Sequence, residues 1–388
     1  MSGERGRQRR DIALLAAGIT VSTAGDSAAL VALLLELRAA GAGWVSAVLA
    51  ADLLPFVVFA SYSGRLVDRV DNRRLLIVAL AGQGLLVVPL AVTRTAWAVV
   101  ALVFAVASFS TLVRPATSAM VPVLAGEERA PSAYAWLATG LGIGWVIGSA
   151  AGGLLTSAFG IGAALLADAG TFIVLAAACA ALSGTRGGGA SDADAAARLG
   201  GMTILWRDRL LRWSVLVTAL AVACAVVDNV AAPFRFINQL HTSSSGYGFY
   251  LSLWGLGALG GSQLPRKIGT PFIPAALAIG NAVSGLGVLG IGVAPDLDIA
   301  LAASLFGGFG NGIANVALNS LVSGRVVENE RGRAFASVGA LIQTGVGVGT
   351  VAGAPLVAVL TAGHAMIAAG ALAAVISGIT IIWTLARA

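Results

Sequence analysis

Long apolar runs alternate with short polar segments along this chain, and each run has about the length of one membrane helix. The hydrocarbon core of a bilayer needs about 20 consecutive apolar residues in a spanning helix. By that measure the sequence predicts twelve membrane-spanning helices. They cover residues 12–37, 44–63, 75–93, 96–124, 133–157 and 161–182, and then 211–237, 246–264, 271–293, 298–323, 334–359 and 363–385.

One long polar stretch, rich in glycine at its start, separates the sixth run from the seventh. The pattern therefore predicts an all-α integral membrane protein made of two six-helix bundles. We expect a cytoplasmic N-terminal tail at 1–11, a first bundle at 12–182, a cytoplasmic linker at 183–210 and a second bundle at 211–388. Within the linker, residues 193–205 are compatible with a short amphipathic helix.

The composition agrees with a protein that lies in a membrane. The 388 residues are 58% apolar and 11% charged, with a mean hydropathy of +0.90, whereas soluble domains are about 45 to 50% apolar and about 25% charged. The sequence contains no HExxH, GxSxG or phosphate-binding loop, so we expect neither an enzyme nor direct ATP drive. Cys179 and Cys224 lie in apolar runs without metal-ligating neighbours, so we expect no disulfide, metal or cofactor.

The positive charges are distributed unevenly across the predicted topology. If the N-terminal tail is cytoplasmic, 20 of the 24 lysines and arginines fall on the cytoplasmic side, as the positive-inside rule requires. The other four are Arg38, Arg94, Arg114 and Arg235. We therefore expect a multi-pass protein of the cell membrane with both termini in the cytoplasm, and its net charge of +6 needs no nucleic-acid partner.

The two halves repeat one another at an offset of 201 residues. Parallel repeats of six spans around a central site are one architecture of membrane transporters. The repeated glycines are spaced to lie along one helix face, where they allow two backbones to approach closely. Either they serve helix packing alone, or the two helices form a sliding contact between the halves. The matched glycines are Gly144, Gly148 and Gly152 with Gly345, Gly349 and Gly353.

A basic segment between the second and third runs, GRLVDRVDNRR from Gly64, resembles the signature loop of the major facilitator superfamily (MFS), roughly GxLxDRxGRR. Asp71 and Asn72 replace the usual glycine and arginine. The resemblance implies that Asp68 faces the N-terminal end of the eleventh helix and latches the outward-facing state, and we expect a tight turn at Gly64. The plainer alternative is a charged turn that obeys the positive-inside rule. The residues that fit the motif are Gly64, Leu66, Asp68, Arg69 and Arg73.

Three further stretches resemble the MFS branch that contains the enterobactin exporter and related drug exporters. They are RPATSAMVPVLAGEERAPSAYAW from Arg114, LLADAGTF around Asp168, and NVALNSLVSGRVVENERGRAFA from Asn315. The resemblance implies export driven by the proton gradient. It does not name the substrate.

Four carboxylates lie inside predicted spans, where an ionisable group is costly and is by default a functional candidate. We expect Asp26 first, and then its counterpart Asp228, to couple transport to protons; the alternative for each is a hydrogen-bonded structural carboxyl. Asp52 either pairs with Arg38 or lines an outer vestibule. For Asp168, a packing or capping role is favoured.

Other polar groups in the spans are candidates to line a substrate cavity. Arg114, in the fourth span, either balances a buried carboxylate, Asp26 or Asp68, or reaches to the inner membrane surface. Three asparagines spaced every fourth residue form a polar seam on the tenth span. This seam serves either interhelical hydrogen bonding or the substrate path. The cavity candidates are Asn311, Asn315, Asn319, Gln343 and Trp145.

These features together favour a proton-coupled exporter of small amphipathic molecules, such as drugs, siderophores or secondary metabolites, working by alternating access as a monomer. Its expected partners are a small-molecule substrate, protons and the lipid bilayer. One alternative is a facilitator or a symporter-type importer of a small metabolite, in which Asp26 binds substrate. A receptor or scaffold without transport is a second alternative, from a different class of protein.

Overall fold

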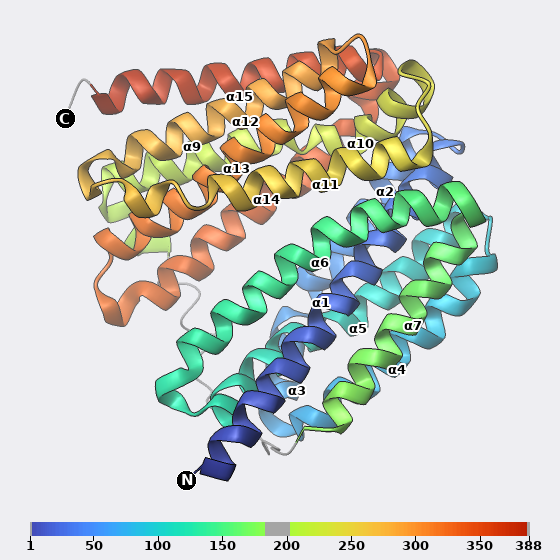
Figure 1. Cartoon of the computed structure of the whole chain (residues 1–388). Helices are drawn as coiled ribbons and strands as arrows, with labels where there is room; N and C mark the ends of the chain where they lie inside the picture. Colours follow the sequence, from blue (N-terminus) through green and yellow to red (C-terminus); the bar gives the residue numbers. More distant parts are fainter. Residues whose placement is uncertain (1, 183–201, 386–388) are drawn as a thin grey trace. The chain divides into compact units, whose positions relative to one another are not determined.

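The computed structural model describes residues 2–182 and 202–385, which form helices joined by short turns (Figure 1). The chain divides into two compact units, Met1–Ser191 and Asp192–Ala388. The helix expected near 193–205 lies mostly outside the described residues. Its end is described, and residues 202–207 are helical.

The first unit follows the order of the six predicted spans. Five of the spans are single helices, and the second span is divided between α2 and α3. The helices are α1 (Ser2–Arg38), α2 (Ala42–Val58), α3 (Ala60–Arg69), α4 (Asn72–Val92), α5 (Ala96–Ala125), α6 (Ala130–Phe159) and α7 (Ile161–Ala180).

The second unit also follows the predicted order. Its first span is divided into α9, α10 and the π-helical segment η2. The helices are α9 (Arg209–Ala225), α10 (Val227–Phe234), η2 (Arg235–Gln239), α11 (Ser244–Gly261), α12 (Ile273–Val293), α13 (Leu297–Arg325), α14 (Arg331–Val359) and α15 (Ala362–Leu385).

The span count agrees with the expected all-α membrane fold of two six-helix bundles. Among the described residues, 10 helices are long and apolar enough to cross a membrane, or 11 when the bent pair α2 and α3 is one span. The one predicted span outside this count is the eighth, 246–264, which corresponds to α11. This 18-residue helix contains six glycines, three serines and two tyrosines, and these residues lower its hydropathy below that of the ten candidate spans.

Aspartates and glycines set several of the helix boundaries. Asp71, Asp208 and Asp296 are N-caps whose carboxylates accept hydrogen bonds from N–H groups in the first turns of α4, α9 and α13, and such a bond satisfies a donor that the helix itself leaves free. Gly126 and Gly160 end α5 and α6 with φ values of 79° and 81°. This left-handed backbone conformation suits glycine because it has no Cβ.

The signature segment is helical over most of its length, which corrects the turn expected at Gly64. Gly64 lies inside α3, and a Cβ added to it would meet nothing within 4 Å. The chain instead turns at Val70 and Asp71, where the Asp71 carboxylate accepts a hydrogen bond of 2.8 Å from the backbone N–H of Arg74. Asp71, a departure from the family pattern, is therefore the residue that starts the next helix.

The repeated glycines bring backbones into contact within each unit. In the first unit α6 lies along α1 (Figure 1), and a Cβ added to Gly148 would collide with the backbone of Ala24. In the second unit a Cβ added to Gly349 would collide with the carbonyl oxygen of Ala223 on α9. These glycine faces are turned toward a helix of their own unit and serve helix packing there. A sliding contact of the two helices between the halves stays a prediction.

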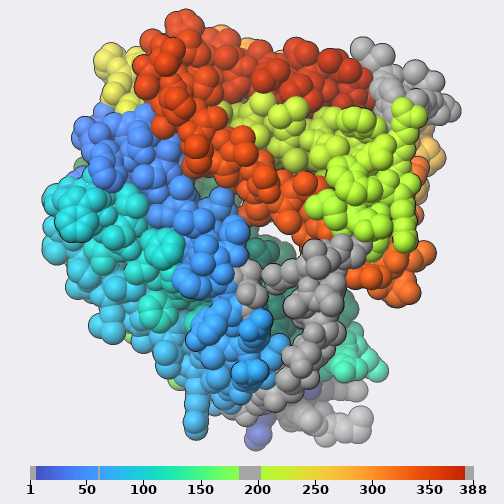
Figure 2. Space-filling model, turned by 180° about the vertical axis from the view of Figure 1, so that it is seen from behind, coloured from blue at the N-terminus to red at the C-terminus, as the bar shows by residue number. Residues whose placement is uncertain are grey.

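In the second unit α9 packs against α14 and α15, as the adjoining surfaces in Figure 2 show. At the start of α9, the helical segment 202–207 is joined to the same unit. Its side chains Ile204 and Leu205 are buried in a core cluster with residues of α9, α12, α13 and α14. The end of the predicted linker is therefore anchored to the second unit by apolar packing.

Candidate functional site

Three carboxylates of the first unit interact around α1. Asp26 on α1 interacts electrostatically with Asp52 on α2 and with Asp168 on α7. The Asp26 and Asp52 side chains are exposed, whereas Asp168 is only 2% exposed. An arrangement of this kind can hold a proton that is shared among neighbouring acids.

Asp168 lies in the contact between α1 and α7. The Thr171 hydroxyl donates to the Asp168 backbone carbonyl at 2.7 Å and lies 3.4 Å from its carboxylate oxygen. Gly25 permits this close approach, because a Cβ there would lie 2.5 Å from the Asp168 Oδ1 atom. Sequence reasoning missed the closeness of Asp168 to Asp26, because it depends on how α1 and α7 pack.

The second unit holds a buried carboxylate of its own, Asp228, in the first turn of α10. Its side chain is 5% exposed, and the Tyr250 hydroxyl of α11 donates a hydrogen bond to its Oδ2 atom. Its Oδ1 atom has no hydrogen-bond partner among the described residues. A buried carboxylate with one oxygen unpartnered is costly as an anion, so this position suits a group that takes up and releases a proton.

Two aromatic rings pack against Tyr250, the hydrogen-bond partner of Asp228. The ring centroids of Phe236 and Tyr250 are 4.6 Å apart, and those of Tyr247 and Tyr250 are 5.7 Å apart. The Ser304 hydroxyl of α13 donates to the Tyr250 backbone carbonyl at 2.7 Å and so ties α11 to α13. The sequence carries no spacing signal for this cluster, because its members come together only through packing.

The helix break beside Asp228 separates α9 from α10 at Val226. Just beyond it, the Asn229 N–H bonds to the Val226 carbonyl, three residues back, at 3.0 Å. Further along the span, Pro233 lacks an N–H group, and η2 begins two residues after it, at Arg235. Departures from regular helix inside spans recur where ions or substrates bind.

The remaining candidates of the second unit lie largely on exposed surfaces. Asn315 donates from its side chain to the carbonyl oxygen and the side-chain oxygen of Asn311, at 3.0 and 3.1 Å. Asn315, Asn319 and Gln343 are exposed, and Asn311 is half-buried. Hydrogen bonding along the asparagine seam of α13 is thus present within that helix.

In the first unit, Trp145 on α6 is half-buried and Arg114 on α5 is exposed. None of the ion pairs among the described residues includes Arg114. A direct pair of Arg114 with Asp26 or with Asp68 is therefore not formed in this structure.

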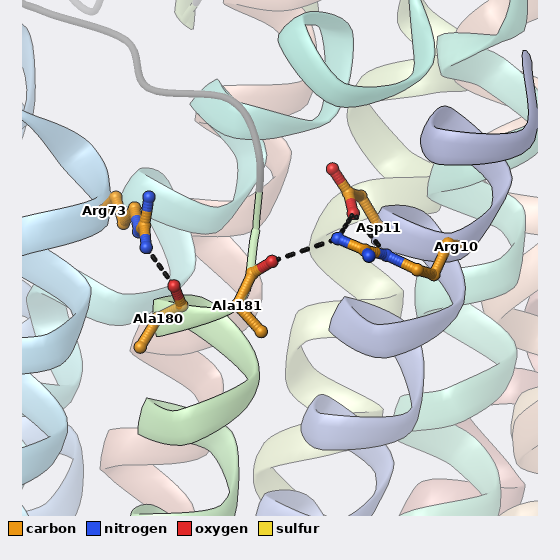
Figure 3. Close-up of polar contacts among 5 residues, drawn as sticks. All are labelled: Arg10, Asp11, Arg73, Ala180 and Ala181. Atoms are coloured by element: carbon orange, nitrogen blue, oxygen red, sulfur yellow. Dashed lines mark hydrogen bonds and ion pairs between the residues drawn. The ribbon is translucent and has the colours of Figure 1, made fainter. Parts of the chain in front are cut away.

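Arg73 of the signature segment binds the C-terminal end of α7 within its own unit. It donates to the Ala180 carbonyl, and Arg10 donates to the neighbouring Ala181 carbonyl at 3.3 Å while lying 3.2 Å from Asp11 (Figure 3). Cations at a helix C-terminus donate hydrogen bonds to the free carbonyl groups and interact favourably with the negative end of the helix dipole. Asp68 is half-buried and Arg69 is exposed on α3.

No group of three or more histidine, cysteine, aspartate or glutamate side chains among the described residues could hold a metal ion. The chemistry that this geometry offers is that of carboxylates within apolar helices, three that interact in the first unit and Asp228 in the second. Such groups can exchange a proton, bind a cation or accept a hydrogen bond.

A protein-family model matches most of this chain. The model of the Major Facilitator Superfamily matches residues 13–343, which span both units. The chain belongs to the major facilitator superfamily. It is therefore a multi-pass membrane transporter, from a family whose members are generally not enzymes.

One relative of this MFS chain is an uncharacterized MFS-type transporter, YfiS, of Bacillus subtilis (strain 168). The two are 27% identical over 174 residues, which cover 44% of this chain and 42% of the relative. The match thus spans less than half the length of either protein.

Solved structures of other transporters share the fold over nearly the whole chain. The nucleoside transporter NupG is 13% identical with a TM-score of 0.76, and the alignment covers 97% of this chain and 98% of that one. A bacterial homolog to the human lysosomal transporter Spinster, in an inward-facing and unoccupied conformation, is 12% identical with a TM-score of 0.72. That alignment covers 98% of this chain and 95% of the homolog. A POT family transporter in complex with a thioalcohol conjugated peptide is 10% identical with a TM-score of 0.75. That alignment covers 97% of this chain and 96% of the POT family transporter. At these identities the likeness is one of fold.

Proposed function

We propose that this MFS chain is a proton-coupled secondary active exporter of small amphipathic molecules, such as drugs, siderophores or secondary metabolites. Substrate leaves the cell as protons enter it, and the two six-helix units open the binding site to one side of the membrane and then to the other. Both termini lie in the cytoplasm, and the monomer is the working unit. No cofactor is needed, because the proton gradient supplies the drive.

The observation that carries the proposal is the state of Asp228. Its carboxylate is buried, accepts one hydrogen bond from Tyr250 and leaves Oδ1 without a partner among the described residues. A proton on Oδ1 removes the cost of a buried anion, and its loss is favoured when water or a cationic group reaches the site. This cycle is what coupling to a proton gradient requires.

Asp26 supplies a second acid with different access. It is exposed on α1 and interacts with the carboxylates of Asp52 and Asp168. Mutual repulsion favours a proton within such a group. We propose that Asp26 exchanges its proton with the aqueous side of the pathway and competes there with substrate.

The test is substrate-driven proton release in everted membrane vesicles, read with a pH-sensitive dye for a panel of lipophilic cations, neutral drugs and siderophores. The variants are Asp26→Asn, Asp228→Asn and, as matched control, Asp298→Asn. Asp298 is an exposed aspartate in the first turn of α13 and belongs to neither acid group.

We expect a substrate-dependent proton signal in the wild type and in Asp298→Asn, and its loss in Asp26→Asn, in Asp228→Asn or in both. A signal that survives both substitutions removes these residues from the coupling. Substrate flux without any proton signal, in wild type and variants alike, contradicts antiport and favours the facilitator alternative.

A further inference from the structure

A cleft of about 790 Å³ lies between the first halves of α1 and α6 in the first unit. Two arginines, Arg9 and Arg129, lie at the start of these helices and line its mouth. Neither forms an ion pair or a side-chain hydrogen bond among the described residues. The cleft plays no part in the acid groups described above.

The neighbouring arginines differ from this pair in having partners. Arg10 and Arg73 bind the carbonyl groups at the end of α7, and Arg10 also pairs with Asp11 (Figure 3). At the cleft, no carboxylate is among the lining residues. Among the described residues that line the opening, these two positive charges therefore have no anion to balance them.

The start of α6 adds to the positive electrostatic potential at the mouth of the cleft. This 30-residue helix begins at Ala130, directly after Arg129, so the positive end of its dipole lies at the cleft mouth. An anion there gains from the two guanidinium groups and from the helix end together.

Polarity falls along the cleft from this mouth inward. Beyond the arginines its walls are mostly apolar, with Ile12, Ala16 and Ile143 among them, and Trp136 beside the opening is 65% exposed. From Arg9 to Thr20, the last lining residue along α1, the helix rises about 16 Å at about 1.5 Å per residue. The walls thus suit an elongated apolar body attached to an anionic head.

We propose that this cleft binds an anionic amphiphile, with its phosphate or carboxylate head between Arg9 and Arg129 and its apolar body along Trp136 and Ile143. The head has two possible sources, an anionic phospholipid of the surrounding leaflet or a free single-chain amphiphile. The site repels lipophilic cations because both charges at its mouth are positive.

The test is ligand retention by the purified full-length chain in nonionic detergent, read by native mass spectrometry. The ligands are phosphatidylglycerol, phosphatidylcholine, dodecyl phosphate and inorganic phosphate. The variant is R9Q/R129Q, and the control is R7Q/R74Q, which removes two exposed arginines that do not line the cleft. R9K/R129K keeps both charges and shows whether positive charge alone is enough for binding, and the melting temperature of each variant shows whether it folds normally.

We expect the wild type, the control and R9K/R129K to retain one anionic amphiphile, and R9Q/R129Q to bind it about tenfold or more weakly, since each cation near a headgroup contributes about a factor of five. Retention of phosphatidylglycerol over dodecyl phosphate identifies a lipid, and the reverse identifies a free amphiphile. Equal retention by wild type and R9Q/R129Q overturns the proposal. So does phosphatidylcholine binding as tightly as phosphatidylglycerol, or inorganic phosphate as tightly as dodecyl phosphate.

Discussion

At the scale of single residues, the meaning of each glycine depends on what a methyl group in its place would touch. A Cβ at Gly148 would enter the backbone of Ala24 on α1, whereas a Cβ at Gly64 meets nothing within 4 Å. Both glycines are helical. Only the first is therefore required by packing, although the family motif contains the second.

A pair of alanine substitutions separates these two cases. Gly148→Ala must push α6 away from α1, and overpacking of this kind costs about 1 to 3 kcal/mol. Gly64→Ala is expected to be neutral or slightly stabilising, because alanine favours helix over glycine. The melting temperature of the purified protein measures both changes. Equal melting temperatures for the two variants would show that α1 and α6 can separate freely at this contact.

Residue pairing across helices marks the limit of what the sequence could predict about the candidate site. Four carboxylates inside spans could be found from hydropathy alone. Their partners could not, because the Tyr250 hydroxyl and Asp228 are 22 residues apart and meet only when α10 packs beside α11. The same holds for Asp168, which lies against Gly25 of α1.

At the scale of helices, hydropathy predicted where spans lie but not where they break. The pair α2 and α3 is bent by 57°, and the seventh predicted span breaks at Val226. Pro55 precedes the first break and Pro233 follows the second. A proline removes one helical hydrogen bond but does not by itself fix where or how far a helix bends, since packing decides this.

The N-cap of α9 offers a test of helix boundaries at the end of the linker. The Asp208 carboxylate accepts from the N–H groups of Leu210 and Leu211 at 2.9 and 3.0 Å and pairs with Arg325 at 2.7 Å. Replacing it with alanine removes a cap and is expected to cost about 1 kcal/mol. Asp208→Ser keeps the cap and loses only the half-exposed ion pair, which contributes about 1 kcal/mol at most.

Unfolding of the purified protein in denaturant distinguishes the two contributions. We expect Asp208→Ala to be less stable than Asp208→Ser, and Arg325→Gln to resemble Asp208→Ser. If Asp208→Ser is as unstable as Asp208→Ala, the ion pair rather than the cap supports α9.

Asp208 is also expected to make the stability of the second unit sensitive to acid. Partial burial by itself raises the pKa of Asp208, but hydrogen bonds from Leu211 and Leu210 and the Arg325 guanidinium outweigh it and lower the pKa below 3.8. The unfolded chain therefore binds the proton more readily than the folded chain. The stabilisation is complete above about pH 4 and is lost as the pH falls through the lower folded value. Melting temperatures measured from pH 6 to pH 3 should decline less steeply for Asp208→Asn than for the wild type.

At the scale of the whole molecule, the distribution of arginines predicts which loops face the cytoplasm. Single cysteines at two exposed positions test it: Arg74→Cys in the first turn of α4, at the basic end of that helix, and Thr95→Cys in the loop at its other end. The native cysteines, Cys179 and Cys224, are buried and are replaced by alanine for this experiment. A membrane-impermeant maleimide should label Thr95→Cys in intact cells and Arg74→Cys only in everted vesicles. The opposite pattern would reverse the proposed orientation of the chain.

The contact between α6 and α1, and its counterpart between α14 and α9, also bear on how the molecule responds to heat. Side chains that interlock lose rotamer freedom, and this entropic cost grows with temperature. Gly148 and Gly349 face the backbones of Ala24 and Ala223, and neither glycine nor alanine has rotamers to lose. In water glycine is a source of chain flexibility. At these two helix contacts, however, it allows an association between helices whose strength should change little on warming.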